Sequence, residues 1–108
     1  LARRQAEGGG LEDARQTLAQ SLPAAADRAD YQGFIAHVLL RLKRGKEAEQ
    51  HYQQATRLAP GDGRWWLGLG LAQEAEGQVN EARESFLRAR QTGRLSPELM
   101  ELVEQKLK

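Results

Sequence analysis

The amino-acid sequence predicts an all-α domain in which a pair of helices is repeated, that is, a helical-hairpin solenoid. Three observations predict this fold. Apolar residues return every three to four positions, which is the period of an α-helix. Glycine or proline stands where one helix should end and the next begin. Residues of one kind also recur at a spacing of 34, as in the sets Ala14, Ala48, Ala82 and Leu18, Tyr52, Phe86.

This register divides the chain into four segments. We expect a truncated unit over residues 1–28, complete units over 29–62 and 63–95, and a helix over 96–108. The apolar stripes of the central unit comprise Tyr31, Phe34, Ile35, Val38, Leu39 and Leu42, then Ala48, Tyr52, Ala55 and Leu58. The second stripe of the next unit comprises Val79, Ala82, Phe86 and Ala89. Gly45 is expected in the turn between the central helices, and Pro60 closes that unit because proline cannot continue a helix.

The glycine-rich stretch over residues 62–78 is interpreted as the first helix of a unit. A phosphate-binding loop would need a preceding strand and a Gly-Lys-Ser/Thr ending, and neither is present. In a helix, Trp66, Leu69 and Gly70 fall on one face. Gly70 is then small because a neighbouring helix approaches closely. The pattern gives no packing reason for Gly68.

The last segment has the signals of a separate helix. Ser96 can cap it and Pro97 suits its first turn. Its apolar stripe comprises Leu99, Leu102, Val103 and Leu107. We interpret it as the capping helix that covers the last exposed core face of a solenoid. The alternative is a helix that binds a partner.

Composition excludes several functions. Lys and Arg number 16 against 15 Asp and Glu, which argues against a nucleic-acid binder that neutralises phosphates. There is no cysteine, and His37 and His51 lie on different predicted helices, so no metal site, catalytic group or cofactor site is expected. No stretch reaches the ~18 apolar residues of a membrane span, so this segment is not expected to contact a membrane directly.

At the 34-residue spacing the chain resembles the tetratricopeptide repeat family. Trp66-x2-Leu69-Gly70 and Ala82-x3-Phe86 follow its pattern, although Gln73 replaces the usual tyrosine. The resemblance implies a non-catalytic scaffold for protein–protein interaction, in which the first helices line a concave groove for a protein or peptide partner. Because Leu1 falls inside a first helix, we expect further repeats upstream.

The resemblance implies a partner-binding groove formed by Arg3, Asp30, Phe34, His37, Arg41, Arg64, Trp65, Leu67, Leu71 and Glu74. Leu67 and Leu71 are expected to be exposed to an apolar partner, or else to pack on the C-terminal helix. Trp66 matches the core position of the family. Trp65 is a candidate contact residue, with burial against the preceding repeat as the alternative. Chaperone-binding members clamp a carboxylate with Lys and Asn, but Gly33, His37, Leu67 and Leu71 occupy those positions here, so a chaperone adaptor is not expected.

Residues 62–71, 74–77, 93–99 and 103–105 resemble more narrowly the C-terminal repeats of bacterial MSHA-type pilus biogenesis N proteins. This implies a role in type IV pilus assembly, with the domain in the periplasm and an inner-membrane anchor upstream. A cytoplasmic location is the alternative. Two other functions remain open at this point. One is structural self-association as a homo-oligomer, and the other is a regulatory domain of an enzyme.

Overall fold

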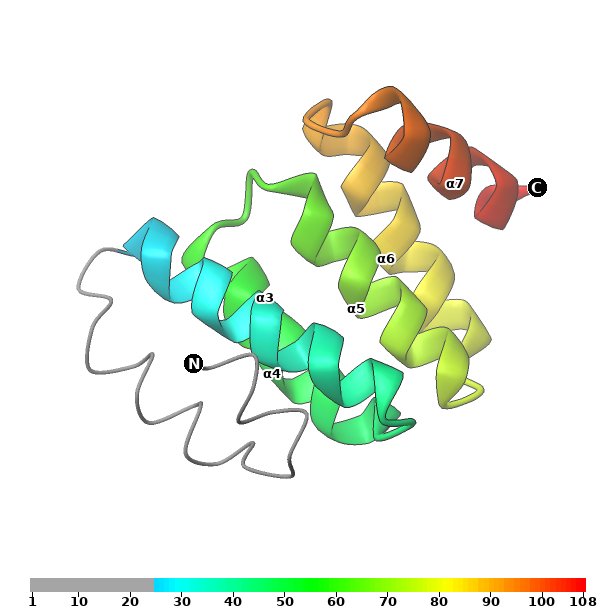
Figure 1. Ribbon diagram of the computed structural model, residues 1–108. Coiled ribbons are helices and arrows are strands. Elements are labelled where there is room, and N and C mark those ends of the chain that lie inside the picture. Colours follow the sequence, from blue (N-terminus) through cyan, green and yellow to red (C-terminus); the bar gives the residue numbers. More distant parts are fainter. Residues whose placement is uncertain (1–24) are drawn as a thin grey trace.

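The computed structural model describes residues 25–108, and every regular element between them is a helix. The helices are α3 (Ala25–Arg41), α4 (Gly45–Leu58), α5 (Gly63–Ala75), α6 (Val79–Thr92) and α7 (Pro97–Leu107). Figure 1 shows two antiparallel hairpins, α3–α4 and α5–α6, followed by α7. The predicted all-α helical-hairpin solenoid is therefore confirmed. The expected truncated unit and Arg3 lie largely or wholly outside the described residues.

α3, α5 and α7 run in the same direction in Figure 1, and α4 and α6 return between them. The most extensive helix contacts are within the hairpins, and α4 also packs on α5 and α6 on α7. This order places the first helix of each hairpin on the same side of the molecule. It is the arrangement that creates a surface shared by α3, α5 and α7.

The helix ends follow the local sequence signals. The side chain of Asp62 caps α5 by accepting a hydrogen bond of 3.1 Å from the backbone N–H of Arg64. Ser96 caps α7 by accepting a bond of 3.3 Å from the backbone N–H of Leu99, and Pro97 is the first residue of that helix, as predicted. Gly45 is the first residue of α4 rather than a turn residue, because the turn is made by residues 42–44.

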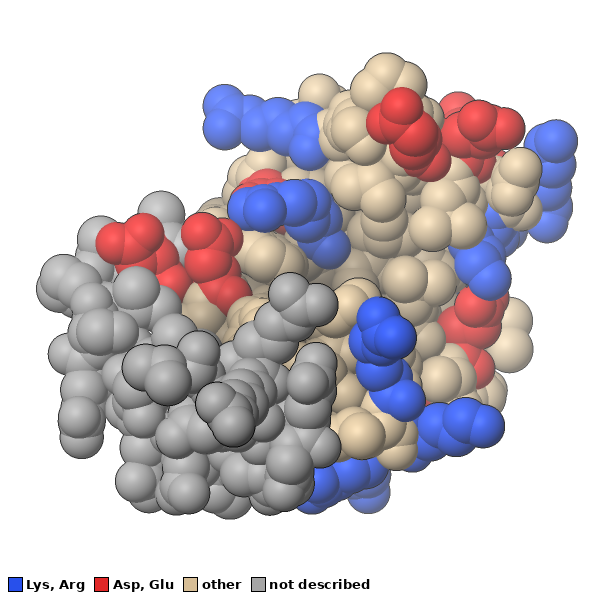
Figure 2. Space-filling view, viewed as in Figure 1, with Lys and Arg blue, Asp and Glu red and all other residues tan. Residues whose placement is uncertain are grey.

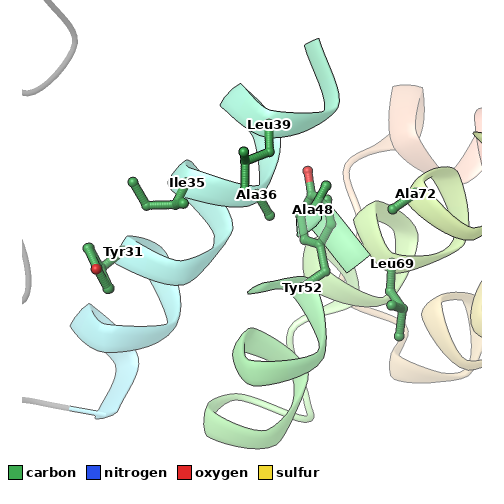
Figure 3. Packing of buried hydrophobic residues seen from close by; sticks show 8 residues of the cluster. All are labelled: Tyr31, Ile35, Ala36, Leu39, Ala48, Tyr52, Leu69 and Ala72. Carbon is green, nitrogen blue, oxygen red and sulfur yellow. The ribbon is translucent and has the colours of Figure 1, made fainter. Parts of the chain in front are cut away.

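Apolar residues from both hairpins form the first part of the core. Its buried members are Tyr31, Ile35, Ala36, Leu39, Ala48, Tyr52, Leu69 and Ala72. In Figure 3, Ala48 and Tyr52 lie between the residues of α3 and those of α5. A second cluster joins α5, α6 and α7 through Leu67, Ala82, Phe86, Ala89 and Val103. Two predicted stripe residues are wrong, since Leu42 is 50% and Val79 70% exposed. Leu42 lies just beyond the end of α3 and Val79 at the start of α6, where neither faces another helix.

Aromatic rings pack directly on the two glycines of α5. A side chain added at Gly70 would come within 2.5 Å of the Phe86 ring, which supports the predicted close approach of a neighbouring helix. A side chain added at Gly68 would overlap the ring of Tyr52 on α4. Gly68 therefore has the packing role that the sequence pattern did not reveal. It lets the preceding hairpin insert a ring against the backbone of α5.

The departure from the family pattern at Gln73 introduces a polar pair into the core. Gln73 and Ser85 are both buried, and the Ser85 hydroxyl donates a 2.6 Å hydrogen bond to the Gln73 side-chain oxygen. This bond joins α5 to α6. It satisfies polar atoms that would otherwise be buried without a partner.

Candidate binding groove

A groove of about 520 Å³ lies on the face shared by α3, α5 and α7. The lining residues are Asp30, Gly33, Phe34, His37, Tyr52, Arg64, Trp65, Leu67, Gly68, Leu71, Leu99 and Leu102. In Figure 2 the surface between α5 and α7 is mostly uncharged, and charged side chains stand around it. The lining is thus predominantly apolar, with Asp30 and Arg64 near the starts of α3 and α5 and His37 further along α3.

Trp65 is packed against Gly33 of the preceding hairpin. Any side chain at Gly33 would overlap the six-membered part of the indole. The ring is half-buried, and it also packs on the apolar cluster between the hairpins. Because Gly33 has no side chain, the Trp65 ring can pack directly against the backbone of α3. This is the burial against the preceding repeat that the sequence left as an alternative, and part of the ring still lines the groove.

The two neighbouring tryptophans are held differently. The Trp66 indole N–H donates a 2.8 Å hydrogen bond to the backbone oxygen of Pro60. The Trp65 indole N–H is buried and meets no hydrogen-bond acceptor within the described part of the chain. Trp66 has a directional hydrogen bond in addition to its packing, whereas the Trp65 indole N–H has none among the described residues. An unpaired buried donor costs about 1–3 kcal/mol, so Trp65 is the less firmly held of the pair.

Arg64 closes one end of the groove. Its guanidinium lies 4.5 Å from the centre of the Trp65 ring, within the range of a cation–π contact. It donates hydrogen bonds of 2.6–3.2 Å to both carboxylate oxygens of Asp62 and one of 3.2 Å to Asp30 of α3. The hydrogen bond from Arg64 lowers the pKa of Asp62, and the same bond raises the pKa of Arg64. Within residues 25–108, Arg64 and Asp30 are the Asp, Glu, Lys or Arg side chains that line the groove, and they form an ion pair with each other.

α7 forms the opposite wall and touches the floor. Leu99 and Leu102 line the groove and also pack on the cluster around Leu67 and Phe86. Leu67 is 4% exposed, so the expectation that it projects into solvent is wrong. Leu71 is half-buried and keeps part of its side chain in the groove. These leucines pack near the C-terminal helix and also line the groove, because α7 lies at the edge of the groove.

The structure brings most of the predicted groove residues together. Those that line it are Asp30, Phe34, His37, Arg64, Trp65, Leu67 and Leu71, together with Gly33 at one of the clamp positions. Arg41 is exposed at the end of α3 and lies outside the groove. Glu74 also lies outside, where its carboxylate accepts a 2.7 Å hydrogen bond from Lys106 of α7.

Sequence reasoning missed four lining residues. They are Tyr52, Gly68, Leu99 and Leu102. The Leu99–Leu102 pair was visible as part of the apolar stripe of 96–108, but the whole stripe was assigned to capping. Tyr52 carried no signal, because the register assigns it to the core. Burial raises the pKa of Tyr52 to about 12, so its hydroxyl is neutral at physiological pH and adds no charge to the groove.

Two further features, a group of metal ligands and a membrane-spanning helix, are absent from residues 25–108. No group of three or more His, Cys, Asp or Glu side chains is placed there to hold a metal ion. His51 has a ring nitrogen 2.7 Å from the side-chain oxygen of Gln32, while His37 is exposed at the groove. Among the same residues, no helix combines the length and the apolar character needed to cross a bilayer.

The comparisons with known proteins agree with this geometry. The family model described as tetratricopeptide repeat matches residues 1–63 and again residues 35–97. The chain belongs to the tetratricopeptide repeat family. Such repeats are in general non-catalytic scaffolds for protein–protein interaction. No curated protein sequence matches the chain.

A solved structure with the same fold is the NMR structure of the second TPR domain of the human RPAP3 protein in complex with the HSP70 peptide SGPTIEEVD. The TM-score is 0.73, the identity is 19%, and the match covers 99% of this chain and 89% of that chain. At this identity the similarity establishes the shared fold of the two repeat domains.

Proposed function

We propose that this tetratricopeptide repeat domain is a non-catalytic scaffold that binds a segment of a partner protein in the groove between α3, α5 and α7. The observation that carries the proposal is the apolar groove of about 520 Å³, whose size lies in the ~300–1,000 Å³ range of sites that hold a ligand. The proposed contact residues are Asp30, Phe34, His37, Arg64, Trp65, Leu71, Leu99 and Leu102. Arg3 is retained from the sequence resemblance. Arg41 and Glu74 are proposed to stand at the margin.

The lining has the composition of an interface centre. Aromatic residues and arginine are enriched where truncation to alanine costs the most binding energy. Here Phe34, Trp65 and Arg64 stand together on helices, and Trp65 is braced by Gly33. A partner would bury these side chains against a surface that is already formed. Little conformational entropy would be lost from the scaffold.

The related fold supports a peptide partner. The RPAP3 domain was solved with an HSP70 peptide, so a domain of this architecture holds a peptide ligand. In the present chain, the positions where the resemblance implies the Lys and Asn clamp for a carboxylate hold Gly33, His37, Leu67 and Leu71. We therefore propose a partner of a different chemical type.

A narrower proposal concerns the biological setting. Residues 62–71, 74–77, 93–99 and 103–105 resemble MSHA-type pilus biogenesis N proteins. On that basis we propose a role in bacterial type IV pilus assembly with the domain in the periplasm. Cross-linking in whole cells of the source organism tests this. Pilus components recovered with the parent chain would support the setting. Recovery of cytoplasmic proteins alone would refute it.

The binding function is tested by two matched substitutions of an apolar residue by aspartate. Leu71→Asp places a charge in the groove at a half-buried position, and Val79→Asp places one at an exposed position on α6 outside the groove. Leu67 is not substituted, because a charge at a buried position would unfold the domain. We expect proteins captured by the parent and by Val79→Asp to be lost with Leu71→Asp while circular dichroism of both variants stays helical. Equal capture by all three would refute a groove site, and a concentration-dependent mass would favour self-association.

A further inference from the structure

We infer that the segment held in this groove is an amphipathic α-helix whose buried face is uncharged and apolar. The inference rests on the proposed binding function and specifies the partner chemistry. It distinguishes the helix from two other occupants of such a groove. One is an extended peptide, and the other is an acidic chain end with a free carboxylate.

Most of the lining offers nothing to a peptide backbone, and its exposed polar side chains, Asp30, His37 and Arg64, lie on α3 and at the start of α5. An extended segment has unpaired backbone N–H and C=O groups, and burying them without partners costs about 1–3 kcal/mol each. The large apolar side chains of the lining include Phe34, Trp65, Leu71, Leu99 and Leu102. None of these side chains has a free hydrogen-bonding group facing a ligand, since the Trp65 N–H is itself buried. A helix satisfies its backbone internally, so it alone enters such a lining without this cost.

The charges of the groove argue against an acidic chain end. Among the described residues, Arg64 is the one lysine or arginine in the lining, and it is engaged by Asp62 and Asp30 and stacked over Trp65. A ligand carboxylate would have to compete with both aspartates for this charge. An uncharged apolar face meets no such competition, and burial of its side chains supplies the driving force.

The arrangement of the helices suits a helical guest. α5 forms the floor, while α3 and α7 stand on either side of it and run in the same direction (Figure 1). Packed helices are about 8–10 Å apart, so the trough between two outer helices lies over the middle one and takes the ridge of another helix. The guest would present large apolar residues at positions i, i+3, i+4 and i+7. Leu71 on the floor and Leu99 and Leu102 on the wall are the complementary contacts.

Peptide display on phage tests the inference with defined probes. One random library carries peptides of about three helical turns fused through their C-termini, so that no free carboxylate is present. A second library presents the same lengths with free C-termini. Both are selected on the parent domain. The enriched peptides are then synthesised with acetylated and amidated ends, and their affinity is measured from Trp fluorescence or calorimetry.

We expect enriched sequences with large apolar residues at helical spacing, recovered from the first library as well as the second. Their affinity should fall about tenfold or more with Leu71→Asp and stay within about twofold with Val79→Asp. A proline in the middle of the peptide should abolish binding, because it breaks the helix.

The remaining outcomes separate the inference from the function. Groove-dependent peptides that need an acidic free C-terminus, or that alternate apolar and polar residues and tolerate proline, would overturn the helical occupant and leave the binding function standing. Enriched peptides that bind Leu71→Asp as well as the parent would overturn both. A failure to enrich any peptide from either library would also count against both.

Discussion

In the α3–α4 hairpin, Gly33 and Phe34 occupy the positions that Leu67 and Gly68 occupy in the α5–α6 hairpin, 34 residues later. The glycine of the second hairpin is therefore one position later in the repeat than that of the first. An aromatic ring from the other hairpin packs on each glycine. Trp65 of α5 packs on Gly33, while Tyr52 of α4 packs on Gly68. The repeats therefore follow one template for their own hairpin packing. They differ at the junction, where bulk in one repeat fills the space left by the other.

The difference also explains the shape of the groove. Phe34 is half-buried and lines the groove from α3, while Leu67 is buried in the cluster with α6 and α7. The two helices therefore present different side chains to the groove at neighbouring equivalent positions. Identical repeats would place the same side chain on both helices and would not create this difference. Exchange of large and small residues between repeats is thus a local way to make a binding surface on a regular scaffold.

The largest expected effect comes from truncating Phe86, the aromatic residue of the second hairpin that is equivalent to Tyr52 in the first. Phe86 is buried with its ring on Gly70, and Phe86→Ala should lower the free energy of unfolding by about 3–5 kcal/mol because it leaves a cavity. Tyr52→Phe is the control, since it makes the two repeats identical there and removes only a hydroxyl. We expect it to cost less than about 1.5 kcal/mol. Urea denaturation measures both. A loss with Phe86→Ala as small as that with Tyr52→Phe would contradict the packing described.

A smaller effect tests the junction between the hairpins. Gly68→Ala gains up to about 1 kcal/mol of helix propensity but should lose about 1–3 kcal/mol by forcing the Tyr52 ring out of place. We expect a net loss of stability in thermal unfolding. Gly61→Ala is the control, because nothing lies near that position and the change should stay within about 0.5 kcal/mol. A Gly68→Ala variant more stable than the parent would show that helix propensity, not the ring contact, governs this site.

In the first hairpin, Leu39 stands at the position of Gln73, the glutamine of the polar pair in the second hairpin. Ser85→Ala should cost about 1–2 kcal/mol, because it leaves the buried Gln73 oxygen without its donor. Adding Gln73→Leu copies Leu39 of α3 and should recover most of the loss, since neither partner then remains. A double-mutant cycle by chemical denaturation measures the coupling. Additive losses from the two substitutions would rule out the hydrogen bond as their link.

The smallest expected effect concerns the turns. Lys43 and Gly77 occupy equivalent positions, and both have a positive φ, of 62° and 77° respectively. Because glycine adopts this conformation without steric cost, Lys43→Gly should raise stability by about 0.5–1 kcal/mol. Gly77→Lys should lower it by a similar amount. Opposite shifts of the thermal midpoint would support the equivalence of the two turns. A loss of stability in both variants would mean that the Lys43 side chain makes a contact worth more than the backbone strain.

Periodicity in the sequence was sufficient for the hairpins. The recurrence of Ala48 at Ala82 and of Tyr52 at Phe86 established the register, and Ser96 with Pro97 marked the start of the last helix. Leu42 and Val79 were misplaced because they lie at helix ends, where the apolar period continues but no neighbouring helix remains to cover it. The groove was predicted in part, because the family resemblance names the helices that line it. It does not say which side chains neighbouring elements bury.

The sequence by itself determined the all-α class, the repeat length, the caps and the identity of the helices that share a face, because these depend on interactions between residues close together in the chain. Only the tertiary structure decided that Gly68 receives Tyr52, that Gly33 seats Trp65, and that Leu67 is covered while Leu71 still lines the groove. These outcomes depend on contacts between helices far apart in sequence. The 34-residue repeat does not predict these contacts. The repeat relates equivalent positions in successive hairpins, whereas the contacts join positions that are not equivalent.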